Sequence, residues 1–237
     1  METLERLVFL DTETTGLDPR LGHRIIEVAG VEAVDRQITG NSIHFYIDPE
    51  RDIDTGATAV HGFTWDDLRG KQKFAAVIDP VMQFLSGARV IIHNAAFDVS
   101  FLDHELARLR QPGVSGRDFV VDDSLAMARQ KYPGKRNSLD ALCDRLGVDN
   151  SQRNLHGALL DARLLADVYF AMTRGQGCLE MTAPEIEQRP VGVEAINSGD
   201  SNEPLNLFHV EVPGEALAAH ERYVAALNEQ SGRSRLW

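Results

Sequence analysis

Two acidic residues follow the first apolar segment of the chain. Residues 7–10 are apolar without a break and predict a buried β-strand, and Asp11 and Glu13 come next at a spacing of two. Residues two apart on a strand point to the same face of a sheet, so the two carboxylates share a face. Two carboxylates in a partly dry site are costly unless they take up a proton or bind a cation. The pair indicates a divalent-cation site; the alternative is a strand end whose acids are solvated or cap the next turn.

Three more residues are candidates for the same chemistry. Asp98 comes shortly after a second buried strand, in the first turn of the helix that begins at Ala95. Ligands of open α/β sheets collect at strand ends, so Asp98 is expected near the first two acids. Asp161 lies on the last long helix, and a bend at Gly157 places His156 on the loop that enters it. Four acids in polar sequence or on solvated helix faces are assigned no role: Asp18, Asp103, Asp140 and Asp167.

The elements that must position these residues alternate between strands and helices. Strands are predicted at 24–34, 42–47, 88–94 and 119–123, from apolar or alternating patterns. Turns are expected at 35–37 and 39–41, and a loop at 49–58. Helices are predicted at 65–69, 74–85, 124–130, 138–146 and 157–173, with another from Ala95, whose cap is Asn94. An antiparallel meander followed by alternating helices and strands predicts an α/β fold with a mixed central β-sheet flanked by helices.

Length and composition set further limits. The 237 residues are enough for one domain with an appendage, and 43% hydrophobic and 25% charged residues are ordinary for a globular protein. We expect no membrane span and no signal peptide, and the two cysteines, Cys143 and Cys178, fit a reducing cytoplasm. The net charge of −12 argues against broad electrostatic capture of nucleic acid. A nucleic-acid enzyme of this charge would rely on a partner to bring the substrate.

The composition changes near residue 175. Residues 176–204 hold several Gly, Pro, Glu and Asn without a sustained period and are interpreted as a flexible linker. Residues 205–237 contain one predicted strand, 205–212, and one short helix, 216–227. This tail is too short to bury its own apolar residues, so we interpret it as a partner-docking segment; the alternative is a disordered terminus.

Three segments carry a family resemblance. Residues 11–16, 93–98 and 155–162 resemble the three motifs of the DEDDh exonuclease superfamily, and all five of its catalytic positions are filled. Residues 59–62 and 133–142 narrow the resemblance to the proofreading epsilon-subunit family of bacterial DNA polymerase III. The likeness covers residues 5–175, with a looser match in the tail. It implies a ribonuclease H-like exonuclease domain at residues 1–175 and a 3′-to-5′ exonuclease that releases 5′-nucleotides.

The resemblance also implies a role for each acid. Two Mg²⁺ or Mn²⁺ ions, about 3.5–4 Å apart, make the nucleophile and relieve charge on the phosphate. Asp11 would bridge them, Glu13 and Asp161 would complete one site, and Asp98 would hold the second ion directly or through water. His156 would deprotonate the attacking water, a task that suits an imidazole because its ordinary pKa is ~6.5.

Substrate and partner contacts follow from the same likeness. The predicted substrate-binding residues lie on the loops around the acids: Thr14, Thr15, Leu17, His61, Asn94 and Phe97. Thr14 and Thr15 would meet the terminal 3′-OH, Leu17 would wedge against the last bases, and His61 and Phe97 would flank the terminal base. For Leu17 and Phe97, the alternative is ordinary loop and core packing.

The expected partners are DNA 3′ ends and other replication proteins. The tail resembles the segment that binds the polymerase III alpha subunit, and a theta-like subunit is a further expected partner. Residues 176–181 resemble a degenerate sliding-clamp peptide, with Met181 where an aromatic is commoner.

Two alternative functions remain open at this point. A relative of ribonuclease T or oligoribonuclease would use the same site on RNA 3′ ends. A non-catalytic polymerase accessory subunit would release no nucleotide.

Overall fold

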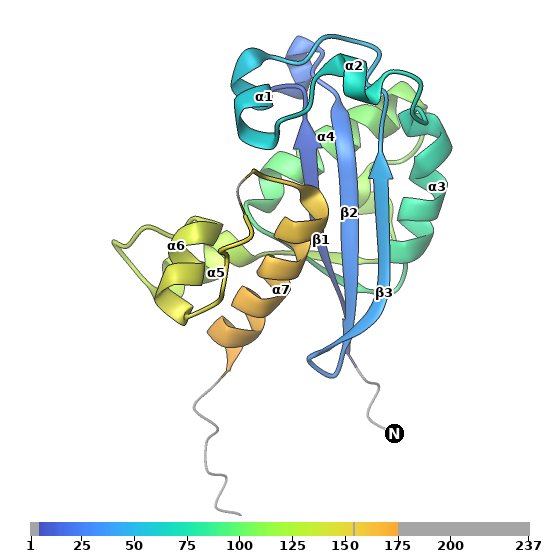
Figure 1. The fold of residues 1–237 in the computed structure, drawn as a ribbon. Helices are drawn as coiled ribbons and strands as arrows, with labels where there is room; N and C mark the ends of the chain where they lie inside the picture. Colours follow the sequence, from blue (N-terminus) through green and yellow to red (C-terminus); the bar gives the residue numbers. More distant parts are fainter. Residues whose placement is uncertain (1–4, 154, 175–237) are drawn as a thin grey trace, which may run out of the picture. The chain divides into compact units, whose positions relative to one another are not determined.

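A five-stranded mixed sheet organises the part of the chain that the computed structural model describes, residues 5–153 and 155–174 (Figure 1). Its strands are β1 (Arg6–Thr14), β2 (Ile25–Val34), β3 (Gln37–Tyr46), β4 (Arg89–Ile92) and β5 (Val120–Asp123), in the order β3-β2-β1-β4-β5. β2 runs antiparallel to both β1 and β3, whereas β1, β4 and β5 run parallel. The carboxyl ends of β1, β4 and β5 therefore meet at one edge of the sheet.

Helices cover both faces of this sheet. The α-helices are α1 (Thr55–His61), α2 (Trp65–Leu68), α3 (Phe74–Leu85), α4 (Ala95–Arg108), α5 (Ser124–Lys131), α6 (Leu139–Leu146) and α7 (Ala158–Thr173), with 3₁₀ turns at Pro19–Leu21 and Val114–Gly116. One apolar core joins α3 and α4 to Val8 and Leu10, and a second joins α5, α6 and α7 to Leu7 and Phe9. Figure 1 shows α7 across one face of the sheet and α3 and α4 on the other side. No described helix is long and apolar enough to cross a membrane.

The alternation of β1 decides which face receives the acids. Leu7 and Phe9 pack toward α7, and the rings of Tyr169 and Phe170 meet Phe9 edge-on at centroid distances of 5.5 and 5.3 Å. Two and four residues beyond Phe9, Asp11 and Glu13 continue along the same face. The apolar packing of α7 thus fixes the register that brings both carboxylates to the start of that helix.

The expected mixed sheet and flanking helices are confirmed, with two local differences. The predicted loop at 49–58 contains the start of α1. The sequence of α1 shows no apolar period, because His61 is the one buried residue of this helix. β3 begins at Gln37 rather than at residue 42, because Asp35 and Arg36 adopt φ of 50° and 60° and close a two-residue hairpin turn. The first six residues of β3 are all exposed and show no alternation. The predicted linker at 176–204, the tail at 205–237 and Cys178 lie outside the described residues.

A buried ion pair ties α4 to the beginning of β2. The guanidinium of Arg24 donates to both carboxylate oxygens of Glu105, at 2.6 and 2.9 Å, and the Glu105 side chain is 2% exposed. Arg24 also donates to the carbonyl of Pro49 at 3.3 Å. This fork holds the helix that carries Asp98 against the loop that follows β1.

Removing one partner of this pair should destabilise the whole domain. We expect Glu105→Gln to lower the free energy of unfolding by about 3–5 kcal/mol, because it leaves the buried Arg24 charge with only the exposed carboxylate of Glu50, 3.9 Å away, as a counter-ion. The matched control is Asp66→Asn, which removes one carboxylate from the exposed Asp66–Arg69 pair and should change stability by less than about 1 kcal/mol. Urea denaturation measures both. Equal effects of the two substitutions would contradict the structural role of Glu105.

Candidate active site

The five candidate catalytic residues come together in one pocket of about 580 Å³, to which β1, α4, α7 and the loop before α7 each contribute: Asp11, Glu13, Asp98, His156 and Asp161. Asp98 and Asp161 are 3% exposed and Glu13 is 9% exposed. Segments more than 140 residues apart in sequence thus place four carboxylates around one small volume.

Thr12, between the two acids of β1, points to the opposite face of the sheet and fixes Asp98. Its hydroxyl donates a 2.7 Å hydrogen bond to Oδ1 of Asp98, and both side chains are buried. Asn94 is at the N-cap of α4, as predicted, but its side chain makes no capping bond. Its backbone is left-handed, with a φ of 69°, and its N–H donates to Oδ1 of Asp123 at 3.1 Å. That bond ties the start of α4 to the end of β5 and so orients the first turn that carries Asp98.

A guanidinium faces the acid of α7. Arg153 donates from Nε to Oδ1 of Asp161 and from Nη2 to Oδ2, both at 2.6 Å. Nδ1 of His156 lies 2.9 Å from Nη2 of Arg153 and 3.2 Å from Oδ2 of Asp161. This nitrogen accepts from the guanidinium when it has no proton and donates to the carboxylate when it has one. The backbone N–H of His156 donates to the carbonyl of Val60 at 3.1 Å, which anchors the loop to α1.

The charges of the site are unbalanced. Burial and the neighbouring carboxylates of Asp98 and Glu13 raise the pKa of Asp11 well above its ordinary value. Burial, together with Asp161 and Glu27, raises the pKa of Glu13 to about 8, and burial raises that of Asp98 to about 7. Burial also acts to raise the pKa of Asp161, but hydrogen bonds from His156 and Arg153 outweigh it and bring that pKa below its ordinary value. Three of the four acids are therefore short of positive charge.

The donor set suits a hard divalent cation. Glu13, His156 and Asp161 each offer one ligand atom, and these three atoms lie within 4.8 Å of one another. Carboxylate oxygens that share a buried site are the usual ligands of Mg²⁺ and Mn²⁺. A cation placed there would offset the burial and the repulsion that raise the pKa of Glu13 and Asp11.

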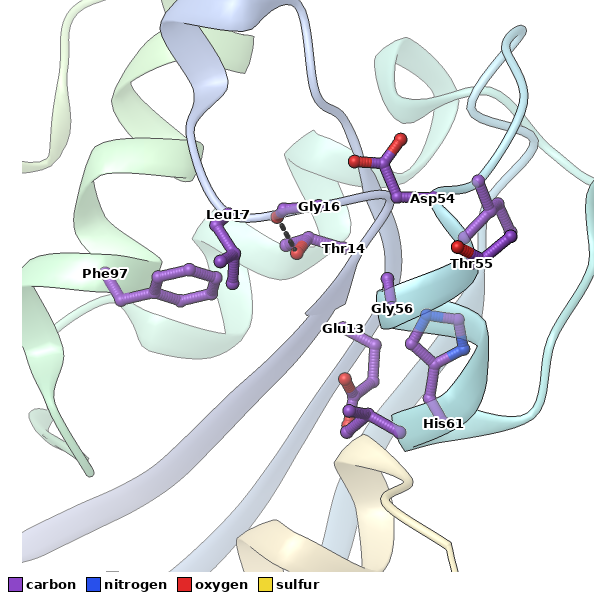
Figure 2. Close-up of a pocket in the computed structure, with 12 residues that line it drawn as sticks. Glu13, Thr14, Gly16, Leu17, Asp54, Thr55, Gly56, His61 and Phe97 are labelled. Carbon is purple, nitrogen blue, oxygen red and sulfur yellow. Dashed lines mark hydrogen bonds between the residues drawn. The ribbon is translucent and has the colours of Figure 1, made fainter.

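A second pocket of about 820 Å³ adjoins the acidic one, because Glu13 and Phe97 line both. Figure 2 shows Leu17 and Phe97 on one side of it, and Thr55, Gly56 and His61 on the other. Thr14 also lines this pocket, and its hydroxyl donates to the carbonyl of Gly16 at 2.7 Å.

The other two predicted substrate-binding residues lie elsewhere. Asn94 lines the acidic pocket. Thr15 lines neither pocket, because its side chain is fully buried. Its hydroxyl lies 3.0 Å from Nδ1 of His23 and accepts from the N–H of Arg24 at the same distance. Its backbone is bonded as well, since its N–H donates to the carbonyl of Arg24 at 2.9 Å and its carbonyl accepts from the N–H of Asp54 at 3.0 Å. Thr15 thus holds the loop in place.

Three residues of this site were not predicted from the sequence, and a fourth was assigned no role there. No sequence pattern pointed to Thr12 or Arg153, because their contacts with Asp98 and Asp161 form only when the chain folds. A pattern did point to Glu27: an acid inside the apolar strand 25–34, opposite Glu13 in the β1–β2 register. Glu27 is 2% exposed and lies 2.6 Å from Nε2 of His44. Asp140, which was assigned no role, accepts a hydrogen bond from Nη1 of Arg153.

Comparison with known proteins identifies the class. Residues 8–169 match the Exonuclease family RNase_T. Exonuclease X, solved in complex with 5′ overhanging duplex DNA, aligns with a TM-score of 0.54 and 26% identity over 70% of this chain and 90% of its own. Escherichia coli exonuclease I, at 21% identity, shares the fold with a TM-score of 0.62 over 70% of this chain and 40% of its own. The family match and the fold are those of an exonuclease.

Full-length relatives narrow the class further. DNA polymerase III subunit epsilon of Haemophilus influenzae is 43% identical over 98% of this chain and 94% of its own length. The epsilon subunit of Rickettsia prowazekii is 48% identical over 92% of this chain and 95% of its own length. The chain belongs to the family of DNA polymerase III epsilon subunits, and the resemblance drawn from the motifs is confirmed.

The raised pKa values of Glu13 and Asp98 imply that the stability of the fold depends on pH. Between pH 4.5 and 8 the folded protein holds more protons on Glu13 and Asp98 than the unfolded chain does, so in chelator the free energy of unfolding should fall as pH rises. Glu13→Gln removes part of this cost. We expect that variant to be about 1–3 kcal/mol more stable than wild type at pH 8 and nearly equal at pH 5, by urea unfolding in EDTA. A variant less stable at pH 8 would contradict the charge balance described here.

Proposed function

We propose that this protein removes nucleotides from the 3′ ends of DNA as the proofreading exonuclease of a bacterial replicative polymerase. The observation that carries the proposal is the pocket in which four carboxylates and His156 meet. Membership of the epsilon-subunit family supports it. So does the likeness to exonuclease X, which was solved with duplex DNA.

Four carboxylates are assigned to two divalent cations, Mg²⁺ or Mn²⁺: Asp11, Glu13, Asp98 and Asp161. When bound, such a pair makes a nucleophile at neutral pH and offsets charge on the phosphate. Asp11 would contribute to both sites, Glu13 and Asp161 to one of them and Asp98 to the other. Ligand atoms of Glu13 and Asp161, together with one of His156, lie within 4.8 Å of one another, which supports one site.

His156 is assigned the proton transfer. Its Nδ1 faces Arg153 and Asp161, so Nε2 is the nitrogen left to take a proton from the attacking water. Its side chain is 42% exposed, which leaves room for substrate and water to approach. A neutral imidazole fits this task near pH 7.

The larger pocket is proposed to hold the terminal nucleotide. Leu17 and Phe97 on one wall and His61 on the other offer apolar and aromatic surfaces that accept any base. Thr14 and Asn94 are proposed to contact the sugar and phosphate, and Thr15 is proposed to support that contact by fixing the loop. A mispaired end would reach this pocket more often than a paired one, because separating its last bases costs less.

Partner binding is proposed for the rest of the chain. In this proposal residues 1–175 form the exonuclease domain, 176–204 a linker, and 205–237 a segment that binds the polymerase alpha subunit in the cytoplasm. A theta-like subunit and the sliding clamp, through residues 176–181, are further proposed partners. The epsilon-subunit relatives, which match nearly the whole chain, support a tail of this kind. A strongly acidic protein also benefits from a partner that presents the DNA.

Digestion of a DNA primer with a mispaired 3′ end tests the function. We expect the full chain to release 5′-nucleotides one at a time with Mg²⁺ or Mn²⁺ and none with chelator. The rate on a matched RNA end should be lower. His156→Ala should slow release by ~10²–10⁴, because the base is lost, while Mn²⁺ binding measured by calorimetry is retained.

Three results would contradict this assignment. A faster reaction on RNA ends would indicate an RNA 3′-end exonuclease, and no metal-dependent release would indicate an accessory subunit. Equal loss of metal affinity in His156→Ala would assign that residue to the metal rather than to the proton transfer. A half-buried histidine that lines neither pocket, replaced as His104→Ala, is the matched control and should leave the rate unchanged.

Truncation after Gly175 separates the two proposed parts of the chain. The shortened protein should keep nuclease activity, because every residue that lines either pocket lies before residue 162. It should lose association with the polymerase alpha subunit, measured by size-exclusion chromatography. Retained association would contradict the docking role of residues 205–237.

A further inference from the structure

Arg153 lies in the acidic pocket with almost no exposure to water. Its side chain is 6% exposed and that of Asp161 is 4% exposed. Its two bonds to the Asp161 carboxylate form the planar fork that binds an arginine most firmly to an acid. Both oxygens of a proposed metal ligand are thus already bonded to a fixed positive charge.

The same guanidinium has a second acidic partner. Its Nη1 donates to Oδ1 of Asp140, in the first turn of α6. The Asp140 side chain lines the pocket but is 52% exposed, so it lies on the solvent side of the buried acids. Arg153 therefore bridges a buried acid and an exposed one, both of which line the pocket.

The other acids of the pocket lack such a partner. Within residues 5–153 and 155–174, no lysine, arginine or histidine forms an ion pair with Asp11, Glu13 or Asp98. Of the four acids, Asp161 is the one that the described part of the chain pairs with a guanidinium. A divalent cation bound to Asp161 would lie close to the guanidinium of Arg153, which already donates hydrogen bonds to the same carboxylate. The two positive charges would repel each other unless the guanidinium moved away.

We propose that Arg153 is a displaceable counter-ion that competes with the divalent cation for Asp161, releasing this carboxylate when the cation binds while Asp140 retains the guanidinium. The inference rests on the metal site proposed above. Arg153 acts through Asp161 and is a positioning residue: it keeps the carboxylate in place and sets the cation concentration at which the site fills. Asp140 provides the partner that makes the release possible.

Manganese titration of the full-length protein, followed by the electron paramagnetic resonance of free Mn²⁺, tests this competition. Arg153→Gln should bind Mn²⁺ roughly three- to tenfold more tightly than wild type, because a partly screened like charge is removed from beside the ligand. The matched control is Arg163→Gln, which removes the same charge from an exposed position two residues from Asp161 and should change the affinity by less than about twofold. Unchanged or weaker binding in Arg153→Gln would overturn the proposal.

A second variant tests the part assigned to Asp140. Asp140→Asn should weaken Mn²⁺ binding by roughly two- to threefold, because Arg153 then keeps Asp161 as its one acidic partner. Asp144→Asn removes a charge from an exposed position on the same helix and is the control. In the Arg153→Gln background the effect of Asp140→Asn should disappear. An effect that persists there, or that Asp144→Asn reproduces, would overturn the role of Asp140.

Thermal unfolding gives a readout that does not depend on activity. In chelator, Arg153→Gln should lower the Tm by several degrees, because Asp161 loses its fork, and saturating Mn²⁺ should abolish most of this difference. An equal loss of Tm in chelator and in Mn²⁺ would assign Arg153 a purely structural role. If wild type binds no Mn²⁺, the proposed function fails; if wild type binds it and Arg153→Gln binds it no better, only this inference fails.

Discussion

Repulsion between buried carboxylates is the constraint around which the described domain is built. Asp11 and Glu13 at the end of β1 lie within reach of Asp98, Asp161 and Glu27, and burial removes the water that would screen them. Bringing these charges together destabilises the folded state, and burial in the two apolar cores must offset this cost. A positively charged ligand offsets such a cost, and the donor set fits a divalent cation.

The topology explains how the acids meet without sharing a segment. β1 is the central strand of the sheet, and α4 and α7 approach its carboxyl end from opposite faces. Because β1 alternates, Thr12 reaches toward α4 and holds Asp98, while the acids on either side of Thr12 face α7. The buried Arg24–Glu105 fork and the bond from His156 to Val60 then fix the loops that surround the site. Each of these contacts joins segments that are far apart in the sequence.

Much of this arrangement could be predicted from sequence because it depends on local periods. The two-residue period of β1 placed Asp11 and Glu13 on one face, and the helical period of α7 gave its buried side. The ion pair of Arg153 could not be predicted, because the path of residues 147–153 follows from packing rather than from any period. α1 was missed for a related reason, since a helix with one buried residue has no apolar pattern. Glu27 could have been found, as a charged residue within an apolar strand.

The charge of the acidic pocket bears on whether cations bind there. One acid has a resident guanidinium and three do not, so the pocket holds less positive charge than its carboxylates need. The most direct measurement is anomalous diffraction from crystals of the protein soaked in Mn²⁺. Two cations bound as proposed would give two peaks in the pocket, at bonding distance from oxygens of Asp11, Glu13, Asp98 and Asp161. Well-ordered carboxylates with no anomalous density between them would contradict it.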